Sequence, residues 1–154
     1  MQHLTVPGRA RLIEQTDGAV PRRKSSNRES CIMSSKKIAI MGTGALGGHV
    51  GGYLAKSGQD VTLIDPWPEH VEHIKREGLT LRGQSAPENF TVKVKAIHLT
   101  ELQEVAKQRP FDVAFVSMKS YDTVWATQMI AQYLAPDAYV VSLQNSINEE
   151  RIAG

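Results

Sequence analysis

Residues 37–48 have the sequence KIAIMGTGALGG, a short apolar run followed at once by closely spaced glycines. The apolar run 38–41 has the continuity expected of a parallel strand that is covered on both faces. Residues 42–47 follow the pattern G-x-G-x-x-G, helical sequence continues over 45–57, and a second apolar run occupies 61–64. A strand, a glycine turn, a helix and a second strand in this order predict a βαβ unit.

In such a unit each of the three glycines has a mechanical role. Gly42 permits the tight turn out of the strand, Gly44 lets the backbone approach a pyrophosphate, and Gly47 lets the helix pack close to the strand. The free N–H groups and the positive dipole end of the helix then favour phosphate. A tight helix–sheet contact with no ligand is the alternative interpretation of the same glycines. The residues of this turn that we expect at a dinucleotide are Gly42, Thr43, Gly44, Ala45, Leu46 and Gly47.

Asp65 ends the second predicted strand, 18 residues after Gly47. A carboxylate there can accept hydrogen bonds from the ribose 2′-hydroxyl of NAD, and it repels the 2′-phosphate of NADP. An aspartate before Pro66 is also a common turn former, and the two roles are compatible. The sequence therefore favours NAD as the cofactor, with NADP as the alternative.

The rest of the chain continues the alternation of strands and helices. We expect helices at 69–76, 102–107 and 123–134, short strands at 79–81 and 90–94, and buried strands at 112–116 and 138–143. This order predicts an α/β fold, a doubly wound parallel sheet of Rossmann-like type with helices on both faces. Residues 1–35 show no sustained period, so we expect a disordered or non-native N-terminal extension, followed by a dinucleotide-binding domain at 36–154.

Composition and motif content give no support to a nucleic-acid partner, a membrane partner or a metal site. The 154 residues are 41% hydrophobic and 22% charged with a net charge of +2, which gives no support to a nucleic-acid or membrane partner. A single cysteine, Cys31, excludes an internal disulfide, and with no secretory signal pattern it favours the cytoplasm. His70 and His73 have no third ligand nearby in the sequence, so we expect no metal site.

Three segments resemble the ketopantoate reductase (2-dehydropantoate 2-reductase) family, within the wider 6-phosphogluconate-dehydrogenase-like group. They are the glycine segment 37–48, the segment DVAFVSMK at 112–119, and VSLQNSINEE at 141–150. The resemblance extends from Lys37 to the last residue. The two later segments are the more specific, because Rossmann domains in general do not require a lysine or a Gln-Asn pair at those strand ends.

The resemblance implies roles for two further residues. Lys119 aligns with the family's first-domain lysine, and Asn145 with the asparagine of its Gln-Asn-Gly motif. Both are then expected beside the cofactor and the substrate, where the lysine attracts a phosphate or carboxylate and the asparagine bridges nicotinamide and substrate. The alternatives are a solvent-facing Lys119 and a turn-capping Asn145. Ser146 stands where the family usually has glycine, which leaves the shape of that turn open.

The function implied by the resemblance is NAD(P)-dependent reduction of a 2-keto acid to a 2-hydroxy acid. Ketopantoate, an intermediate of pantothenate and coenzyme A biosynthesis, is the type substrate of the family. The sequence leaves open whether the chain forms a homo-oligomer. Asp65 replaces the basic residue often used to hold NADP. The family's catalytic lysine belongs to a helical C-terminal domain that we expect to be absent. The catalytic residues therefore stay unknown, because the resemblance implies that they lie beyond Gly154.

Two other functions fit the same fold. A non-catalytic NAD(P)-binding regulatory module is the main alternative, because a binding fold does not itself prove chemistry. A methyltransferase that binds S-adenosylmethionine fits less well, because the full glycine pattern with its close helix suits a pyrophosphate.

Overall fold

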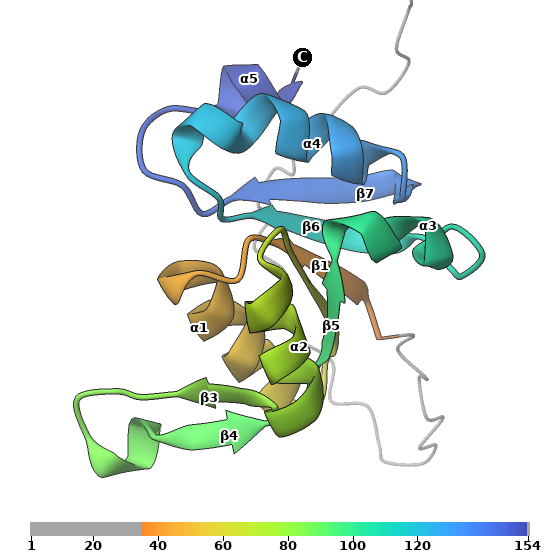
Figure 1. Ribbon diagram of the computed structural model, residues 1–154. Helices are drawn as coiled ribbons and strands as arrows, with labels where there is room; N and C mark the ends of the chain where they lie inside the picture. The colour runs from red at the N-terminus through yellow and green to blue at the C-terminus, as the bar shows by residue number, and fades with distance from the viewer. Residues whose placement is uncertain (1–34, 154) are drawn as a thin grey trace, which may run out of the picture. The chain divides into compact units, whose positions relative to one another are not determined.

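Five parallel strands form the central sheet, in the order β5-β2-β1-β6-β7 (Figure 1). The computed structural model describes residues 35–153, all within one compact unit, Met33–Gly154. The strands are β1 (Lys37–Met41), β2 (Asp60–Asp65), β5 (Lys95–His98), β6 (Phe111–Val116) and β7 (Leu134–Ser142). The predicted Rossmann-like α/β fold is therefore confirmed, whereas the expectation for the N-terminal extension falls outside the described residues, apart from Ser35.

Helices cover both faces of the sheet. They are α1 (Ala45–Lys56), α2 (Pro68–Glu77), α3 (Leu102–Val105), α4 (Thr123–Ala131) and α5 (Glu149–Ala153), with single 3₁₀ turns η1 (Ala86–Glu88), η2 (Leu99–Glu101) and η3 (Ser120–Asp122). Among these described residues no helix combines the length and the apolar character needed to cross a membrane.

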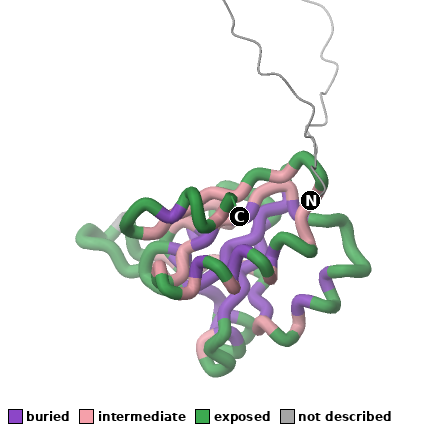
Figure 2. Tube along the Cα trace, turned by 90° about the horizontal axis from the view of Figure 1, so that it is seen from above, coloured by how far each residue is buried: buried purple, intermediate pink, exposed green. Residues whose placement is uncertain are grey.

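Strand β1 shows how the alternation of side chains divides the core. Ile38 and Ile40 pack with residues of α2 in one cluster, whereas Ala39 and Met41 pack with residues of α3 and α4 in the other. Successive strand residues point to opposite faces, so a continuous apolar run is required where both faces are covered. Figure 2 shows the buried positions along the central strands and the exposed ones along the outer turns.

The strand order places a crevice at one end of the sheet. The chain runs outward from β1 through β2 to β5, and then crosses to β6 and β7 on the other side of β1. Met41 is paired with both Ile64 of β2 and Val116 of β6, so the carboxyl ends of the three strands lie together. Ligands of open α/β sheets bind at such a reversal of strand order.

A two-stranded antiparallel hairpin, β3 (Leu79–Leu81) with β4 (Phe90–Val92), lies outside the sheet against α1. The apolar side chains of Val50, Leu54 and Ala55 in α1 pack against the core but are only partly buried. The fully buried positions of α1 are glycines. A Cβ on Gly51 would stand 2.6 Å from Leu63 Cδ2, and one on Gly52 would stand 2.7 Å from Leu81 Cδ1. The extra glycines thus let α1 lie directly on both the sheet and the hairpin.

Two expectations about the elements are wrong. Strand β5 was not predicted, because its sequence KAIH contains only two buried residues and follows a predicted strand without a turn signal. The predicted helix 123–134 ends at Ala131, and β7 begins at Leu134 instead. There Phe111 N donates to Tyr133 O at 2.9 Å and Phe111 pairs with Leu134, so sheet pairing overrides the local helical pattern.

Candidate functional site

The glycine loop between β1 and α1 fits its surroundings so closely that two positions admit no side chain. Gly42 has φ +93°, and a Cβ there would stand 2.7 Å from Met118 Cγ. A Cβ on Gly47 would stand 2.0 Å from Gly42 O and 2.2 Å from Ser117 Oγ. The Ser117 hydroxyl oxygen lies 2.6 Å from the Gly42 carbonyl oxygen, so it links the end of β6 to this loop.

Gly44 is different, because no heavy atom of the described residues outside its immediate chain lies within 4 Å of a Cβ built on it. It is the N-cap of α1, and no side chain of the described residues caps that helix end. Ala45 and Leu46, in the first turn, are exposed. The positive end of a twelve-residue helix therefore meets open space at a position without a side chain, which suits an anion.

Asp65 is buried at the end of β2, and three donors of the chain hold its carboxylate. Thr43 N donates to Oδ2 at 2.6 Å and Thr43 Oγ1 donates to the same oxygen at 2.7 Å. Trp67 N donates to Oδ1 at 2.9 Å. A carboxylate has about four acceptor positions, so one position remains on Oδ1. Asp65 therefore holds the glycine loop in place, a role that the sequence pattern did not indicate.

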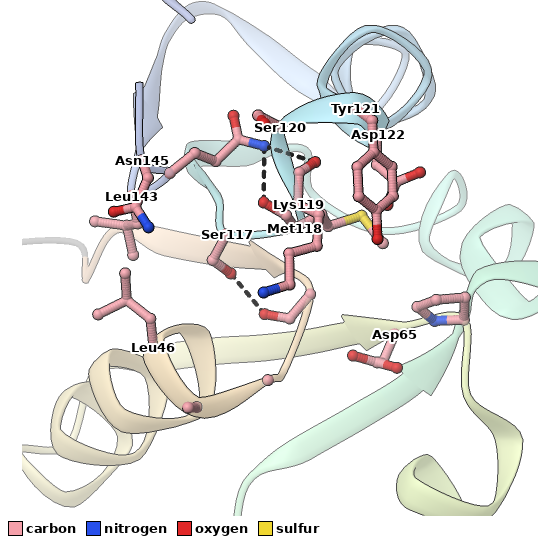
Figure 3. Close-up of a pocket in the computed structure, with 15 residues that line it drawn as sticks. Leu46, Asp65, Ser117, Met118, Lys119, Ser120, Tyr121, Asp122, Leu143 and Asn145 are labelled. Atoms are coloured by element: carbon pink, nitrogen blue, oxygen red, sulfur yellow. Dashed lines mark hydrogen bonds between the residues drawn. The ribbon is translucent and has the colours of Figure 1, made fainter. Parts of the chain in front are cut away.

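A cavity of about 470 Å³ opens over the loop, between the carboxyl ends of β1, β2, β6 and β7 (Figure 3). Its lining comes from the glycine loop (Gly42, Gly44, Ala45, Leu46), from the turn after β2 (Asp65, Pro66), and from the segments after β6 (Ser117–Asp122) and β7 (Leu143–Asn145). A second cavity of about 490 Å³ lies between the start of α2 and the hairpin. The two share Gly44, Ala45 and Asp65.

The second cavity has an aromatic wall. The rings of Trp67 and His70 stack with centroids 5.6 Å apart and an interplanar angle of 26°. Trp67 is 61% exposed, so its ring is open to a ligand in this cavity. His70 Nε2 lies 3.2 Å from Thr43 O, so the same glycine-loop residue contacts both Asp65 and this wall.

Lys119 and Asn145 border the first cavity from neighbouring strands. Both are exposed, Lys119 at the start of η3 and Asn145 three residues after β7. Figure 3 shows Lys119 reaching toward the glycine loop, and Asn145 on the opposite side of the same opening. Most of the residues singled out in the sequence therefore line the first cavity: Gly42, Gly44, Ala45, Leu46, Asp65, Lys119 and Asn145. Thr43 lines only the second cavity, and Gly47 lines neither, because it packs against Gly42 O and Ser117.

The model of the ketopantoate reductase PanE/ApbA family matches residues 38–154. The chain belongs to this family. A 2-dehydropantoate 2-reductase of Pyrococcus horikoshii is 39% identical over 117 residues, which are 75% of this chain and 35% of that protein. The chain thus spans about a third of the length of the curated ketopantoate reductases it matches.

Solved structures of the family share the fold. A PanE/ApbA family ketopantoate reductase from Ralstonia eutropha has 36% identity and a TM-score of 0.66, over 76% of this chain and 37% of that one. A D-mandelate dehydrogenase, solved with NADH and anilino(oxo)acetate, has 32% identity and a TM-score of 0.65. That match covers 76% of this chain and 36% of the dehydrogenase.

The departure from the family motif at Ser146 has a clear backbone consequence. Ser146 has φ +75°, a left-handed conformation that glycine adopts without strain, and the described residues hold no other non-glycine with positive φ. Asn148, 1% exposed, donates through Nδ2 to Asn145 O at 2.9 Å and supports the turn. The turn therefore keeps a conformation that suits glycine, although its residue is serine.

Sequence reasoning missed three residues that hold this site: Ser117, Gln144 and Asn148. Ser117 and Gln144 are polar residues just beyond strand ends, and Asn148 directly precedes α5. Polar residues at such ends are the signal that could have marked them. Among residues 35–153 no three histidine, cysteine or acidic side chains come close enough to share a metal ion.

Proposed function

We propose that this chain is the NAD(P)-binding domain of a reductase that converts a 2-keto acid to a 2-hydroxy acid, of ketopantoate reductase type. One observation carries the proposal: Gly44, without a side chain and with open space above it, lies where two cavities meet at an uncapped helix start. A dinucleotide has this shape, with two bulky ends joined by a pyrophosphate. A tight helix–sheet contact alone explains Gly47 but not the open space at Gly44.

The two cavities support an assignment of the two ends of the cofactor. The pyrophosphate would lie against the start of α1, with the adenosine half in the cavity walled by Trp67 and His70 and the nicotinamide half near Lys119 and Asn145. The aromatic wall offers a stacking surface for a purine. The nicotinamide supplies the hydride when bound, and the residues of the chain orient it and exclude water.

Asp65 supports a preference for NADH. Asp65 lines both cavities, and a ribose hydroxyl bound there can donate to the remaining acceptor position on Oδ1. A 2′-phosphate at the same place would meet a buried carboxylate, and like charges within a few ångströms in a partly buried site repel strongly. The solved D-mandelate dehydrogenase holds NADH, which supports the same class of cofactor.

The substrate side rests on Lys119 and Asn145. An ammonium group attracts the carboxylate of a keto acid, and an amide can accept from the nicotinamide carboxamide or donate to the keto oxygen. Proton donation to that oxygen also needs a positioned acid. We propose that this acid is the family's catalytic lysine and that it lies outside residues 1–154. We also propose that the protein acts in the cytoplasm.

Calorimetric titration of the chain with NADH and NADPH tests the cofactor proposal. We expect NADH to bind more tightly than NADPH. If neither bound the folded chain at millimolar concentration, the proposed function would be wrong.

An assay of NADH oxidation with ketopantoate and other 2-keto acids tests the place of the acid. We expect only background for residues 1–154, because loss of a general acid alone typically removes about 10²–10⁴-fold in rate. Turnover of order 1 s⁻¹, within the usual enzymatic range, would show that this chain completes the catalytic site by itself.

A further inference from the structure

The amide of Gln144 joins the two loops that border the first cavity from β6 and β7. Its Nε2 donates to Met118 O at 2.8 Å and to Lys119 O at 3.2 Å, and Figure 3 marks both bonds with dashed lines. The last backbone bond between these strand ends is Leu143 N to Val116 O, at 2.9 Å. Beyond that bond the Gln144 side chain continues the link between the two segments.

The chemistry of the neighbours fixes the orientation of this amide. Met118 O and Lys119 O are carbonyl oxygens, which only accept, so the NH₂ group must face them. The amide oxygen lies 3.0 Å from Thr123 Oγ1, whose one hydroxyl hydrogen is shared with Ser120 O at 2.8 Å, and 3.5 Å from Ser142 Oγ. Thr123 is fully buried, so the amide is anchored on the protein interior at one end and on the Lys119 loop at the other.

We propose that Gln144 is a positioning residue, which holds Lys119 at a set distance from Asn145 and so adapts the cavity to the nicotinamide end of the cofactor. This inference rests on the proposed function. Lys119 is exposed, so the place of its ammonium group depends on its backbone. That backbone accepts a bond from Gln144, and Asn145 is the next residue after Gln144, so one amide sets both ends of the site.

The second cavity, which contains the aromatic wall, provides an internal control for a test of Gln144. Gln144 lines the first cavity and not the second, which is formed by residues of the glycine loop, α2 and the hairpin. A defect confined to Lys119 would weaken NADH binding and leave binding of ADP unchanged. A general loss of folding would weaken both ligands together.

The experiment titrates NADH and ADP into the full chain and into Gln144→Met, which keeps the length of the side chain and removes both amide groups. We expect NADH to bind about tenfold more weakly and ADP within about twofold of the unmodified chain, as for one lost hydrogen-bonded link. In a Lys119→Met background, Gln144→Met should have no further effect, because it acts through Lys119. Ser142→Ala removes the 3.5 Å contact with the amide oxygen and the 3.3 Å bond from Gln144 N, but it keeps both bonds from the amide to the Lys119 loop. It serves as the matched control, and we expect both ligands to bind within about twofold of the unmodified chain.

Several outcomes would overturn the inference. Unchanged NADH binding in Gln144→Met would remove the positioning role and leave the proposed function standing. Equal losses for NADH and ADP, or additive losses with Lys119→Met, would show a purely structural residue. If the unmodified chain bound neither ligand, the proposed function would fail and this inference with it. Gln144→Glu, which turns an acceptor toward the two carbonyl oxygens, repeats the test if Gln144→Met does not fold.

Discussion

The two sides of the cavity are held in different ways. On the β1–β2 side the glycine loop is fixed by steric fit and by the buried carboxylate of Asp65, which accepts three hydrogen bonds. On the β6–β7 side Lys119 and Asn145 are exposed, and the turn after them holds a serine with φ +75°. The β1–β2 side, which we call the fixed side, has little freedom to change. The β6–β7 side, which we call the variable side, depends on a few side-chain bonds.

The largest expected effect is that of Gly47→Ala. Its Cβ would stand 2.0 Å from Gly42 O, a backbone atom that cannot rotate away, so we expect a loss of stability of about 3 kcal/mol or failure to fold. Urea unfolding measures the change. The control is Gly44→Ala, where a Cβ meets open space, and its stability should stay within about 0.5 kcal/mol.

Gly44→Ala has its own consequence for binding. The added methyl group occupies the space where we propose the pyrophosphate, so NADH affinity should fall at least tenfold while stability is kept. Calorimetric titration of the folded variant measures the affinity. NADH binding equal to that of the unmodified chain would place the ligand elsewhere and would remove the main support for the proposed function.

The fixed side of the cavity is also the side that the sequence predicts best. The glycine spacing and the two apolar runs specify β1, α1 and β2 because their geometry is local. The carboxylate of Asp65 was placed correctly at the end of β2, but its three bonds to the glycine loop and the following turn depend on how β1 and β2 are paired. The spacing of residues in the sequence does not predict that pairing of strands.

The variable side was predicted only through the family resemblance. Lys119 and Asn145 lie just beyond strand ends as expected. Gln144 supports the Lys119 loop through a bond to Met118 O, 26 residues away in the sequence, a contact that the sequence does not show. Strand β5 was missed for a related reason. A four-residue edge strand with two buried residues is defined by its partner β2, and not by its own period.

Substitution of Asp65 tests whether the fixed side depends on one carboxylate. Asp65→Ala leaves Thr43 N and Trp67 N without their acceptor, at about 1–3 kcal/mol for each buried group left unpaired. We therefore expect both NADH and NADPH to bind more weakly, with the difference between them reduced because the repulsion of a 2′-phosphate is lost.

Asp65→Asn is the sharper variant of the same test. Backbone N–H groups face both oxygens of Asp65, so an asparagine must turn its NH₂ toward one of them and cannot satisfy both. Its stability should fall between the unmodified chain and Asp65→Ala in urea unfolding. A preference for NADPH in the unmodified chain would contradict the proposed role of the carboxylate in cofactor choice.

The left-handed backbone of Ser146 predicts a change in stability that is smaller than that of Gly47→Ala and opposite in sign. Ser146→Gly should stabilise the chain by about 0.5–1 kcal/mol, because glycine adopts φ +75° without a steric penalty, which outweighs its greater freedom when unfolded. Ser146→Ala keeps the left-handed conformation and should not stabilise. Urea unfolding of both variants separates relief of strain from loss of the hydroxyl, and a destabilised Ser146→Gly would show that the turn is not strained.

The smallest expected effect concerns an outer support of the fixed side. Glu101 accepts hydrogen bonds from Lys75 Nζ at 2.8 Å and from His98 N at 2.6 Å, and His98 Nε2 lies 2.9 Å from Pro66 O in the turn after Asp65. These donors lower the pKa of Glu101, and the same pair raises the pKa of Lys75. A carboxyl with a depressed pKa in the folded state stabilises it above the unfolded value.

The contribution of Glu101 is therefore complete above about pH 4.3 and lost as the pH falls through its lower folded pKa. Glu101→Gln should reduce the free energy of unfolding by at most about 1 kcal/mol at pH 7, since the pair is partly exposed, and by less at pH 3 than at pH 7. Glu104→Gln, an exposed glutamate of α3, is the matched control and should leave stability unchanged at both values. NADH affinity should not change in Glu101→Gln, because Asp65 holds the glycine loop directly. A loss of NADH affinity would mean that the fixed side of the cavity depends on this outer pair as well.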